Sequence, residues 1–534
     1  MKQYRNITFS ILLGLTLFTS CENLLEVEPE EVVFADDYLQ GDEIDARSAL
    51  FGVLSQLQEV AGQYVVLGEL RADLVNINAN SNDEIREINN HDISEGNSYA
   101  DLTTLFSIIN NCNFALEGID TEANENQLLD DYASILRIRT WSQMQILINY
   151  GKLPYITQPI KTSNELDDTY PLLTIDQALD QLISNLQEVE GVENVTKYPG
   201  SLGFSIFNMI PDQNILLGDL HLWKGNNVLA AIHYKAFLEE SVTSSGAYNL
   251  NVYVTDVTEN NGNFTYSDDW AEIFGENIRT SEVINYVAFS EQFRQPNNAF
   301  SVITSQLKPS LSIISNWMSQ SMAFEGEPVE EGLDIRGGLS ATINSANPVI
   351  TKYQLEYFAW NRAAKIYLRY AEAINYAGHS EQALAILNGI QNNPDGASID
   401  APLFGNDEAY LNFDEFYTYN VLEQPSGGNS GVRGRAGLAA VGGDIDLESA
   451  EAQDLVGALI LNEAALELAF EGNRWEDLLR FSRRDNNPNI LADAVEDKFV
   501  TAGDAGLGAT IKQKLQNPEN WYLPLTIPDN FVSN

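Results

Sequence analysis

One stretch near the C-terminus, Leu459–Asp485, restricts the folds open to this chain more than any other part. Its apolar residues recur at helical spacing. Three acidic residues stand four positions apart on another helical face: Glu463, Glu467 and Glu471. An unpaired row of this kind destabilises a helix by roughly 0.2–0.5 kcal/mol per neighbouring pair, so the row requires basic partners. Arg474 and Arg480 follow at once, and Gly472 offers a helix stop before them. The stretch therefore predicts two helices joined by ion pairs.

Two other segments, Asn214–Val242 and Trp360–Pro394, predict helix hairpins with the small/large rhythm of a tetratricopeptide repeat. In both, a glycine stands seven residues after a small helix residue and makes the turn. An alanine follows five residues later and lets the two helices approach closely. Asp130–Val189 and Leu459–Arg484 are weaker candidates, which gives about four units where at least three are normally needed to bury a shared face. The fold class we predict is mainly α, with a tetratricopeptide-like scaffold.

Three further helices are expected in the first third of the chain: Ala46–Val60, Leu102–Gly118 with Phe106 facing inward, and Asp130–Tyr150. Ile175–Val189 completes the third hairpin. We interpret the polar segment Asn76–Ser98 as a long loop. Asn251–Thr265 and Glu282–Phe289 alternate like short strands.

Gln424–Gly443 holds seven glycines and is expected to be a loop. Within it, Arg433-Gly434-Arg435 is either a solvated, flexible segment or an anion-binding nest. Arg362, Lys365 and Arg369 form a basic stripe at helical spacing that could meet the glutamate row across a helix interface.

The charge balance limits the partners of this chain. It has 29 basic and 77 acidic residues, a formal net charge of −48. Nucleic acid binding requires clustered lysines and arginines, so this balance argues against a nucleic acid partner. A neutral or basic ligand is easier to accept than a polyanion.

The N-terminus has the form of a secretory signal. Lys2 and Arg5 precede an apolar run, residues 7–18, which is too short for a bilayer span of ~20 residues. The run leads into Leu17-Phe18-Thr19-Ser20-Cys21, which resembles a bacterial lipobox. That resemblance implies that the thiol of Cys21 carries lipid and becomes the first residue. The alternative is an ordinary signal with an incidental cysteine. The other cysteine, Cys112, is expected to be a small buried side chain.

The Leu459–Asp485 stretch resembles the C-terminal signature of the RagB/SusD family of nutrient-binding lipoproteins, E-x3-E-L-x-F-E-G-x-R-W-x-D-L-x-R. The residues that match it are Glu463, Glu467, Leu468, Phe470, Glu471, Gly472, Arg474, Trp475, Asp477, Leu478 and Arg480. A second motif, Leu368–Gly378, resembles the family's R-Y-A-E segment, with Arg369 and Glu372 as its charged pair. The tail Trp521–Asn534 resembles the family's terminal motif. We expect these charged signature residues to be structural and not to bind ligand.

This resemblance implies a domain plan and a function. We expect a lipoprotein signal over residues 1–20, an acylated tether over 21–45, and a single SusD-like domain over 46–534. Its helical scaffold would span about 130–250 and 360–484, with irregular, partly β, ligand-facing segments at about 61–101, 251–359 and 395–450. The implied function is a surface-exposed, lipid-anchored outer-membrane protein. It would capture a nutrient, most often a glycan, and deliver it to a TonB-dependent, SusC-like barrel.

Ligand capture in this family uses aromatic faces that stack on sugar rings, together with polar edges. The aromatic candidates lie in the irregular segments: Tyr266, Trp270, Phe293 and Trp317. For each, a place in the core is the alternative. Arg71 and Asp73 are candidates for the polar edge, and a structural ion pair is their alternative.

No catalytic motif is present: the sequence has no HExxH, P-loop or GxSxG, and its four histidines are scattered. We predict no enzyme activity and no cofactor. Asn78-x-Asn80-x-Asn82 is similar to a calcium loop, but Asp83 replaces its glycine, so structural calcium stays open. Two other functions also stay open: a surface glycan-processing enzyme, and a helical-repeat scaffold that binds only protein. The ligand could also be a peptide.

Overall fold

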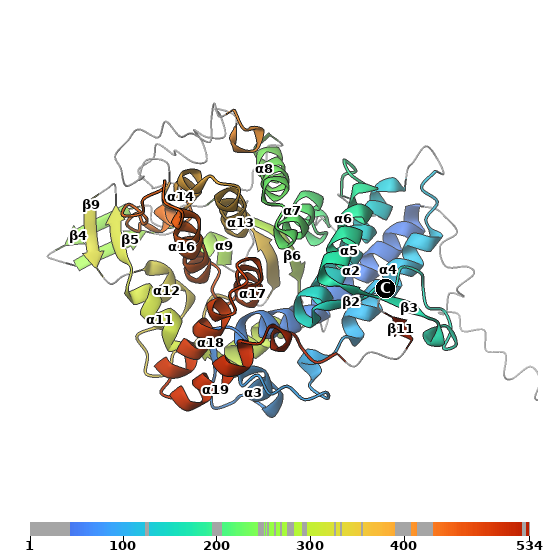
Figure 1. Cartoon of the computed structure of the whole chain (residues 1–534), viewed down its shortest axis with the longest axis horizontal. Coiled ribbons are helices and arrows are strands. Elements are labelled where there is room, and N and C mark those ends of the chain that lie inside the picture. Colours follow the sequence, from blue (N-terminus) through green and yellow to red (C-terminus); the bar gives the residue numbers. More distant parts are fainter. Residues whose placement is uncertain are drawn as a thin grey trace, which may run out of the picture.

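The computed structural model describes residues 43–122, 128–194, 206–243, 250, 253, 256–260, 263–267, 270–274, 282–290, 296–324, 327–331, 334–353, 356–389, 407–413, 431–525 and 530–532. Cys21, Phe293, the predicted signal and the predicted tether before Glu43 lie outside these residues. The described chain is mainly helical, with several small sheets, one of which, containing β6, lies near the centre (Figure 1). This architecture confirms the predicted fold class.

Four helices form one end of the molecule: α2 (Glu43–Val65), α4 (Thr103–Gly118), α5 (Leu129–Tyr150) and α6 (Ile175–Gln187) (Figure 1). They confirm the predicted helices, and α2 runs on into a π-helical turn, Val66–Leu70. Gly151, at a φ of 70°, ends α5, and a capping box between Thr174 and Gln177 begins α6. Cys112 on α4 is fully buried, as expected, and burial raises its pKa to about 12.

The two predicted hairpins are confirmed as α7 (Gln213–Lys224) with α8 (Asn227–Thr243), and α13 (Ala363–Tyr376) with α14 (Ser380–Asn388). Gly225, at a φ of 78°, makes the first turn. The helices of this hairpin pack closely at Gly218, where an added Cβ would lie 2.5 Å from the ring of Tyr234.

The C-terminal stretch forms α16 (Ala452–Glu467) and α17 (Arg474–Arg484), followed by α18 (Asn489–Thr501) and α19 (Ala505–Leu515). The break between α16 and α17 lies where predicted: Gly472 has a φ of 86° and Phe470 a φ of 76°. The shorter helices are α3 (Asp83–Asn89), α9 (Trp270–Phe274), α10 (Asn298–Gln306), α11 (Leu311–Met318) and α12 (Ile335–Ser340).

The strands pair in small sheets. Four pairs are antiparallel: β1 (Val75–Ile77) with β7 (Leu307–Pro309), β4 (Asp256–Asn260) with β5 (Asn263–Ser267), β6 (Val283–Ala288) with β10 (Tyr357–Arg362), and β8 (Ser321–Phe324) with β9 (Glu327–Glu331). A three-stranded sheet joins β2 (Lys152–Pro154), β3 (Tyr170–Thr174) and the C-terminal β11 (Phe531–Val532), which runs parallel to β3. The strands predicted between residues 251 and 289 are therefore confirmed.

The prediction that Asn76–Ser98 is a long loop is wrong. The segment contains part of β1 and the whole of α3. Asn82 caps α3 by accepting a hydrogen bond from the backbone N–H of Ile85 at 2.9 Å, and the side chain of Asn78 accepts one from Asn80 N–H at 2.8 Å. The asparagines that were similar to a calcium loop thus stabilise a turn and a helix start.

The glutamate row forms part of a buried cluster of charged side chains, which we call the hub. It joins five acidic side chains, Glu282, Asp334, Glu463, Glu467 and Glu471, to five basic ones, Arg336, Lys352, Arg362, Arg433 and Arg435. Arg433 and Arg435 are both buried, so the interpretation of their segment as a solvated loop is wrong. They are drawn inward because the row offers more carboxylates than its own hairpin can pair.

The partners first assigned to the glutamate row are also wrong. Arg474 pairs with Asp73 at 2.7 Å, and Arg480 pairs with Glu372 on α13 at 2.6 Å. The left-handed residues between α16 and α17 redirect the chain, so the arginines of α17 do not face the row. Of the predicted basic stripe, Arg362 does meet the row. Arg369 pairs instead with Asp219 and Glu476, and Lys365 donates to the carbonyl of Trp360 at 3.2 Å.

No helix in the described ranges is both long enough and apolar enough to cross a membrane.

Candidate ligand-binding groove

The two predicted tryptophans belong to the core. Trp317 is 0 % exposed, its Nε1–H donates to the carbonyl of Leu466 at 3.2 Å, and its ring meets Phe470 edge-on. Trp270 is 6 % exposed and packs edge-on against Tyr253 at 5.1 Å. Neither ring offers a free face, so their prediction as sugar platforms is wrong and the core alternative is right. Large aromatic side chains gain most when their whole apolar surface leaves water.

Of the other predicted ligand-binding residues, the structure describes the side chains of two. Asp73 forms a two-pronged ion pair with Arg474, at 2.7 and 2.9 Å, so its structural alternative is right. Arg71 is not its partner: the Arg71 guanidinium lies 4.4 Å over the ring of Trp475 and lines a separate cavity. Tyr266 lies on β5 opposite Val257, but its side chain is outside the described part of the chain, as is the whole of Phe293. Their roles stay predictions.

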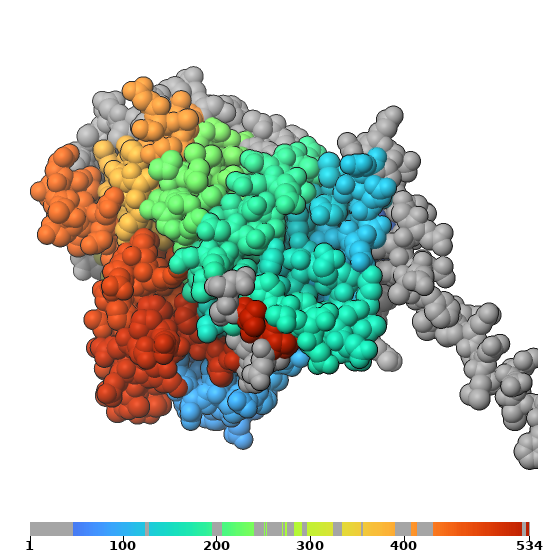
Figure 2. All heavy atoms as spheres, turned by 45° about the vertical axis from the view of Figure 1, so that its right-hand side comes forward, coloured from blue at the N-terminus to red at the C-terminus, as the bar shows by residue number. Residues whose placement is uncertain are grey.

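The largest of the cavities we describe has a volume of about 840 Å³ and lies at the end of the molecule that contains α4 and β3. We call it the groove. Helix α4 forms its floor, the segment from Pro154 to Ile160 and the start of β3 form one side, and the C-terminal tail closes it. Figure 2 shows the last described residues (dark red) lying at the surface against the teal segment that contains β3.

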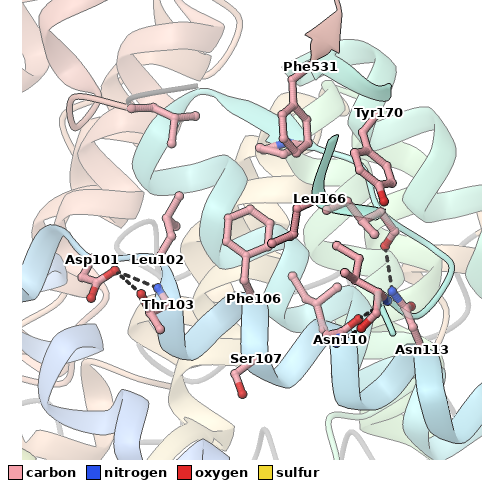
Figure 3. A pocket seen from close by; sticks show the side chains of 15 residues that line it. Asp101, Leu102, Thr103, Phe106, Ser107, Asn110, Asn113, Leu166, Tyr170 and Phe531 are labelled. Atoms are coloured by element: carbon pink, nitrogen blue, oxygen red, sulfur yellow. Dashed lines mark hydrogen bonds between the residues drawn. The ribbon is translucent and has the colours of Figure 1, made fainter. Parts of the chain in front are cut away.

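Three aromatic side chains project into the groove: Phe106 from α4, Tyr170 from β3 and Phe531 from β11 (Figure 3). The rings of Tyr170 and Phe531 lie 5.4 Å apart with 31° between their planes. All three are partly exposed, and Leu166 beside them is 58 % exposed. Such half-buried aromatic surfaces are suited to stack on a ligand.

Backbone pairing builds this arrangement. The N–H of Tyr170 donates to the carbonyl of Asn530 at 3.0 Å, and the side chain of Asn530 donates to the carbonyl of Leu166 at 2.9 Å. At the floor, Asn110 on α4 accepts from the N–H of Ile160 at 2.8 Å and donates to its carbonyl at 3.2 Å. These bonds hold the tail against the β3 segment and the segment from Pro154 to Ile160 against α4.

Few polar groups line the groove, and most are already engaged. Asn113 donates to the carbonyl of Ile156 at 3.1 Å, and the hydroxyl of Tyr170 donates to the carbonyl of Glu165 at 2.6 Å. At the rim, the exposed carboxylate of Asp101 accepts from Thr103, and Ser107 is exposed. The groove therefore offers an aromatic, mostly apolar wall with a polar edge, which is the chemistry of a binding site.

The sequence did not single out this groove. Phe106 was predicted to face the core, and the tail was noted only as a motif. No local signal links α4 to β3 and β11, because only the pairing of β11 with β3 brings Phe531 to Tyr170.

Comparison with known proteins supports a family assignment. A family profile described as the SusD family matches residues 424–534. A SusD-like protein, P38, from Formosa agariphila is 29% identical over 217 residues, which cover 39% of this chain and 42% of that protein. The matched part thus spans less than half the length of this relative.

Solved structures share the fold over most of the chain. A SusD superfamily protein from Bacteroides vulgatus aligns over 90% of this chain and 95% of its own, with a TM-score of 0.59 and 15% identity. A laminarin-binding SusD-like protein aligns over 90% and 99%, with a TM-score of 0.53 and 16% identity. A SusD-like carbohydrate-binding protein from Bacteroides fragilis aligns over 85% and 88%, with a TM-score of 0.54 and 12% identity. The signature at Glu463–Arg480 and the matching C-terminal segment are similar to the SusD/RagB family, and most of the chain shares the fold of SusD superfamily structures.

Proposed function

We propose that this protein is a surface lipoprotein that binds an oligo- or polysaccharide in the groove and delivers it to a TonB-dependent outer-membrane barrel. One observation carries the proposal: three half-buried rings from separate elements converge on one open cavity. A volume of about 840 Å³ lies within the usual range for small-molecule sites, about 300–1,000 Å³. Sugar rings bury apolar C–H faces on aromatic rings while their hydroxyls bond to polar groups at the rim.

The similar structures named above support carbohydrate as the ligand class, because two of them are described as binding laminarin or carbohydrate. The groove supplies apolar faces and leaves Asp101 and Ser107 as polar partners. A peptide with aromatic side chains is the competing ligand.

Isothermal titration with a laminarin oligosaccharide and other glycans tests the site. Replacing Phe106 with Ala removes one platform and should weaken binding by ~1 kcal/mol or more, about fivefold. The matched control is Phe300→Ala on α10, a partly exposed aromatic that does not line the groove; its affinity should equal that of the unchanged protein. Equal affinities for both variants would exclude the groove as the glycan site. Product formation during the titration would favour the enzyme alternative.

A barrel partner requires a protein-binding face, and α8 offers one. Val228, Leu229 and Ile232 are each 42–43 % exposed within about one helical turn. Exposed aliphatic clusters of this kind often mark protein contacts. Val228→Asp with Ile232→Asp should reduce co-purification of the barrel from native membranes while glycan affinity stays unchanged. Undiminished co-purification would place the contact elsewhere.

The proposed anchor is Cys21. Acyl chains contribute ~0.8 kcal/mol per buried CH₂, so a multiply acylated cysteine holds stably in a bilayer. Cys21→Ser should release the protein from the outer-membrane fraction, and mass spectrometry of the native protein should find a lipid-modified N-terminal cysteine. An unmodified protein would refute the anchor and leave the groove proposal standing.

A further inference from the structure

A second cavity, of about 320 Å³, shares no lining residue with the groove. It forms where the end of the α3 region, α17, α19 and the segment Trp521–Pro524 meet. Helices α3 and α19 lie near each other in Figure 1, and the side chain of Lys514 on α19 donates to the carbonyl of His91. Its chemically important lining residues are Arg71, His91, Trp475, Lys514, Glu519 and Trp521.

Arg71 is the unusual residue of this cavity. It is 1 % exposed, and its guanidinium stacks on Trp475 at 4.4 Å. Its Nε donates to the carbonyl of Leu67 at 2.9 Å and its Nη2 donates to the side chain of Asn149. Among the described residues no carboxylate lies within ion-pair distance of it. Burial therefore lowers the pKa of Arg71 to about 9, because no anion offsets the lost hydration.

This lack of a counter-ion is notable in a chain with 77 acidic residues. Every arginine of the hub, and also Arg474 and Arg480, pairs with at least one carboxylate. Arg137 and Arg139 are likewise buried without a carboxylate, but Gln213, Asn194 and the carbonyl of Val192 surround Arg137, Arg139 donates to Asn113, and neither lines a described cavity. Arg71 differs because open space adjoins its guanidinium.

Other groups around the cavity also favour an anion. Lys514 is exposed at its mouth, and Lys498 is buried behind it, where burial lowers its pKa to about 7 and it donates to the carbonyl of Leu70 at 2.7 Å. Burial, together with Lys498 and Arg71, keeps the pKa of His91 well below 6.5, so His91 is neutral. The Nε1–H of Trp475 is buried and has no acceptor in the part of the chain that the structure describes. Asp73 is engaged by Arg474, which leaves Glu519, exposed at the rim, as the one acidic residue that lines this described cavity.

We infer that this cavity binds a small ligand through a carboxylate, which takes the place of the missing counter-ion of Arg71. The two oxygens of a carboxylate match the fork of a guanidinium, and Lys514 adds a second positive charge. Trp521 and Tyr522 would flank the body of the ligand. The negative charge of the whole chain disfavours polyanions, but a single carboxylate inside the cavity responds mainly to the nearby cations. The inference does not depend on the glycan groove.

A carboxylate could belong to a sugar acid or to an amino acid or peptide terminus. Tryptophan fluorescence can distinguish them, because Trp475 and Trp521 line the cavity. One arm compares D-glucuronate with neutral D-glucose, and the other compares N-acetylglycine with its uncharged amide. We expect a saturable change with one or both acids and none with either neutral partner. A change with glucuronate alone assigns the site to sugar acids, and a change with N-acetylglycine alone assigns it to amino acids or peptide termini.

Three variants and one control test the geometry. Arg71→Gln should weaken binding of the acid about tenfold or more, since it removes a charge-assisted bond in a buried site. Lys514→Gln, at the exposed rim, should weaken it about two- to fivefold. Glu519→Gln should tighten it. Lys512→Gln is the matched control, because Lys512 lies on the same helix, pairs with Asp493 and Glu496, and does not line the cavity.

The thermal midpoint of each variant is measured alongside. If Arg71→Gln fails to fold, Lys514→Gln and Glu519→Gln still test the cavity, because both residues are exposed and their replacement should leave the fold intact. Equal responses to the acids and their neutral partners would overturn the inference, as would no response to either acid at millimolar concentration. It would also be overturned if Lys514→Gln and Glu519→Gln both left the affinity unchanged. Loss of acid binding would leave laminarin titration at the groove unaffected, so the two sites fail separately.

Discussion

Replacing Glu467 with Gln tests whether the hub holds the scaffold together. Glu467 is 0 % exposed and accepts from Arg336 and Arg362 at 2.7 Å each, from Arg435, and from the hydroxyl of Tyr253 at 2.7 Å. The hub holds five acidic and five basic groups, so the variant leaves one buried positive charge without compensation. Gln also directs an N–H₂ group at guanidiniums that can only donate.

The expected loss follows from these contacts. Removing one partner of a buried ion pair typically costs 3–5 kcal/mol, and because Gln keeps one carbonyl acceptor we expect about 3 kcal/mol. Urea unfolding followed by circular dichroism at pH 7 measures it. Glu190→Gln is the control, since Glu190 is exposed in a turn, and it should change the unfolding free energy by less than about 0.5 kcal/mol.

The pH dependence gives an independent check. Burial alone would raise the pKa of Glu467, but Arg435, Arg362 and Arg336 outweigh it and hold the pKa well below 4.5. As the pH falls through about 4.5, Glu467 takes up a proton in the unfolded chain but not in the folded protein. The stability that ionised Glu467 contributes is therefore fully present above pH 4.5 and is lost as the pH falls below it. The variant should lose less stability between pH 5 and 3 than the unchanged protein. A loss at pH 7 under about 1 kcal/mol, or an unchanged acid profile, would refute the proposed role of the hub.

Two further predictions concern single contacts. Glu69 is buried, accepts from the N–H groups of Gly472 and Asn473, and leaves Oε2 without a partner. Burial raises its pKa to about 8, so the protein should lose stability as the pH rises from 4.5 to 8. Glu69→Gln should therefore be more stable than the unchanged protein at pH 9 by about 1 kcal/mol or more, but not at pH 4, as measured by thermal unfolding; equal profiles would contradict this. Gly218→Ala should destabilise by roughly 1–3 kcal/mol, because its Cβ would meet Tyr234 at 2.5 Å, whereas Gly338→Ala, with open space, should not; similar unfolding midpoints would exclude a tight contact.

The sequence predicted most of the scaffold, because helices and hairpins depend on local spacing. The breaks at Gly225 and Gly472 were correct, since left-handed glycines end helices through their own backbone. Local spacing could not assign partners across the fold. Arg362 was correctly proposed as a partner of the glutamate row, but the row was also matched to the nearby Arg474 and Arg480, whereas Arg336 and Arg435 reach it from distant segments.

The candidate site could not be predicted for a related reason. Trp317 and Trp270 were chosen because their segments were expected to be irregular, but they lie on the short helices α11 and α9, which pack these large side chains inward. The groove depends instead on Phe106, Tyr170 and Phe531, which are unremarkable in their own segments. Only the parallel pairing of β11 on β3 places them together.

The distribution of charge explains how one chain can present both an apolar groove and a cationic cavity while carrying a net charge of −48. Most described arginines are buried, and most of the buried ones pair with carboxylates, either in the hub or elsewhere in the scaffold. Such pairs are costly to break, so the scaffold keeps its helix register. Arg71 borders a described cavity, and it is buried without a carboxylate partner among the described residues. Because open space adjoins Arg71 and no carboxylate lies within ion-pair distance of it in the described residues, its charge favours recognition of an acidic ligand.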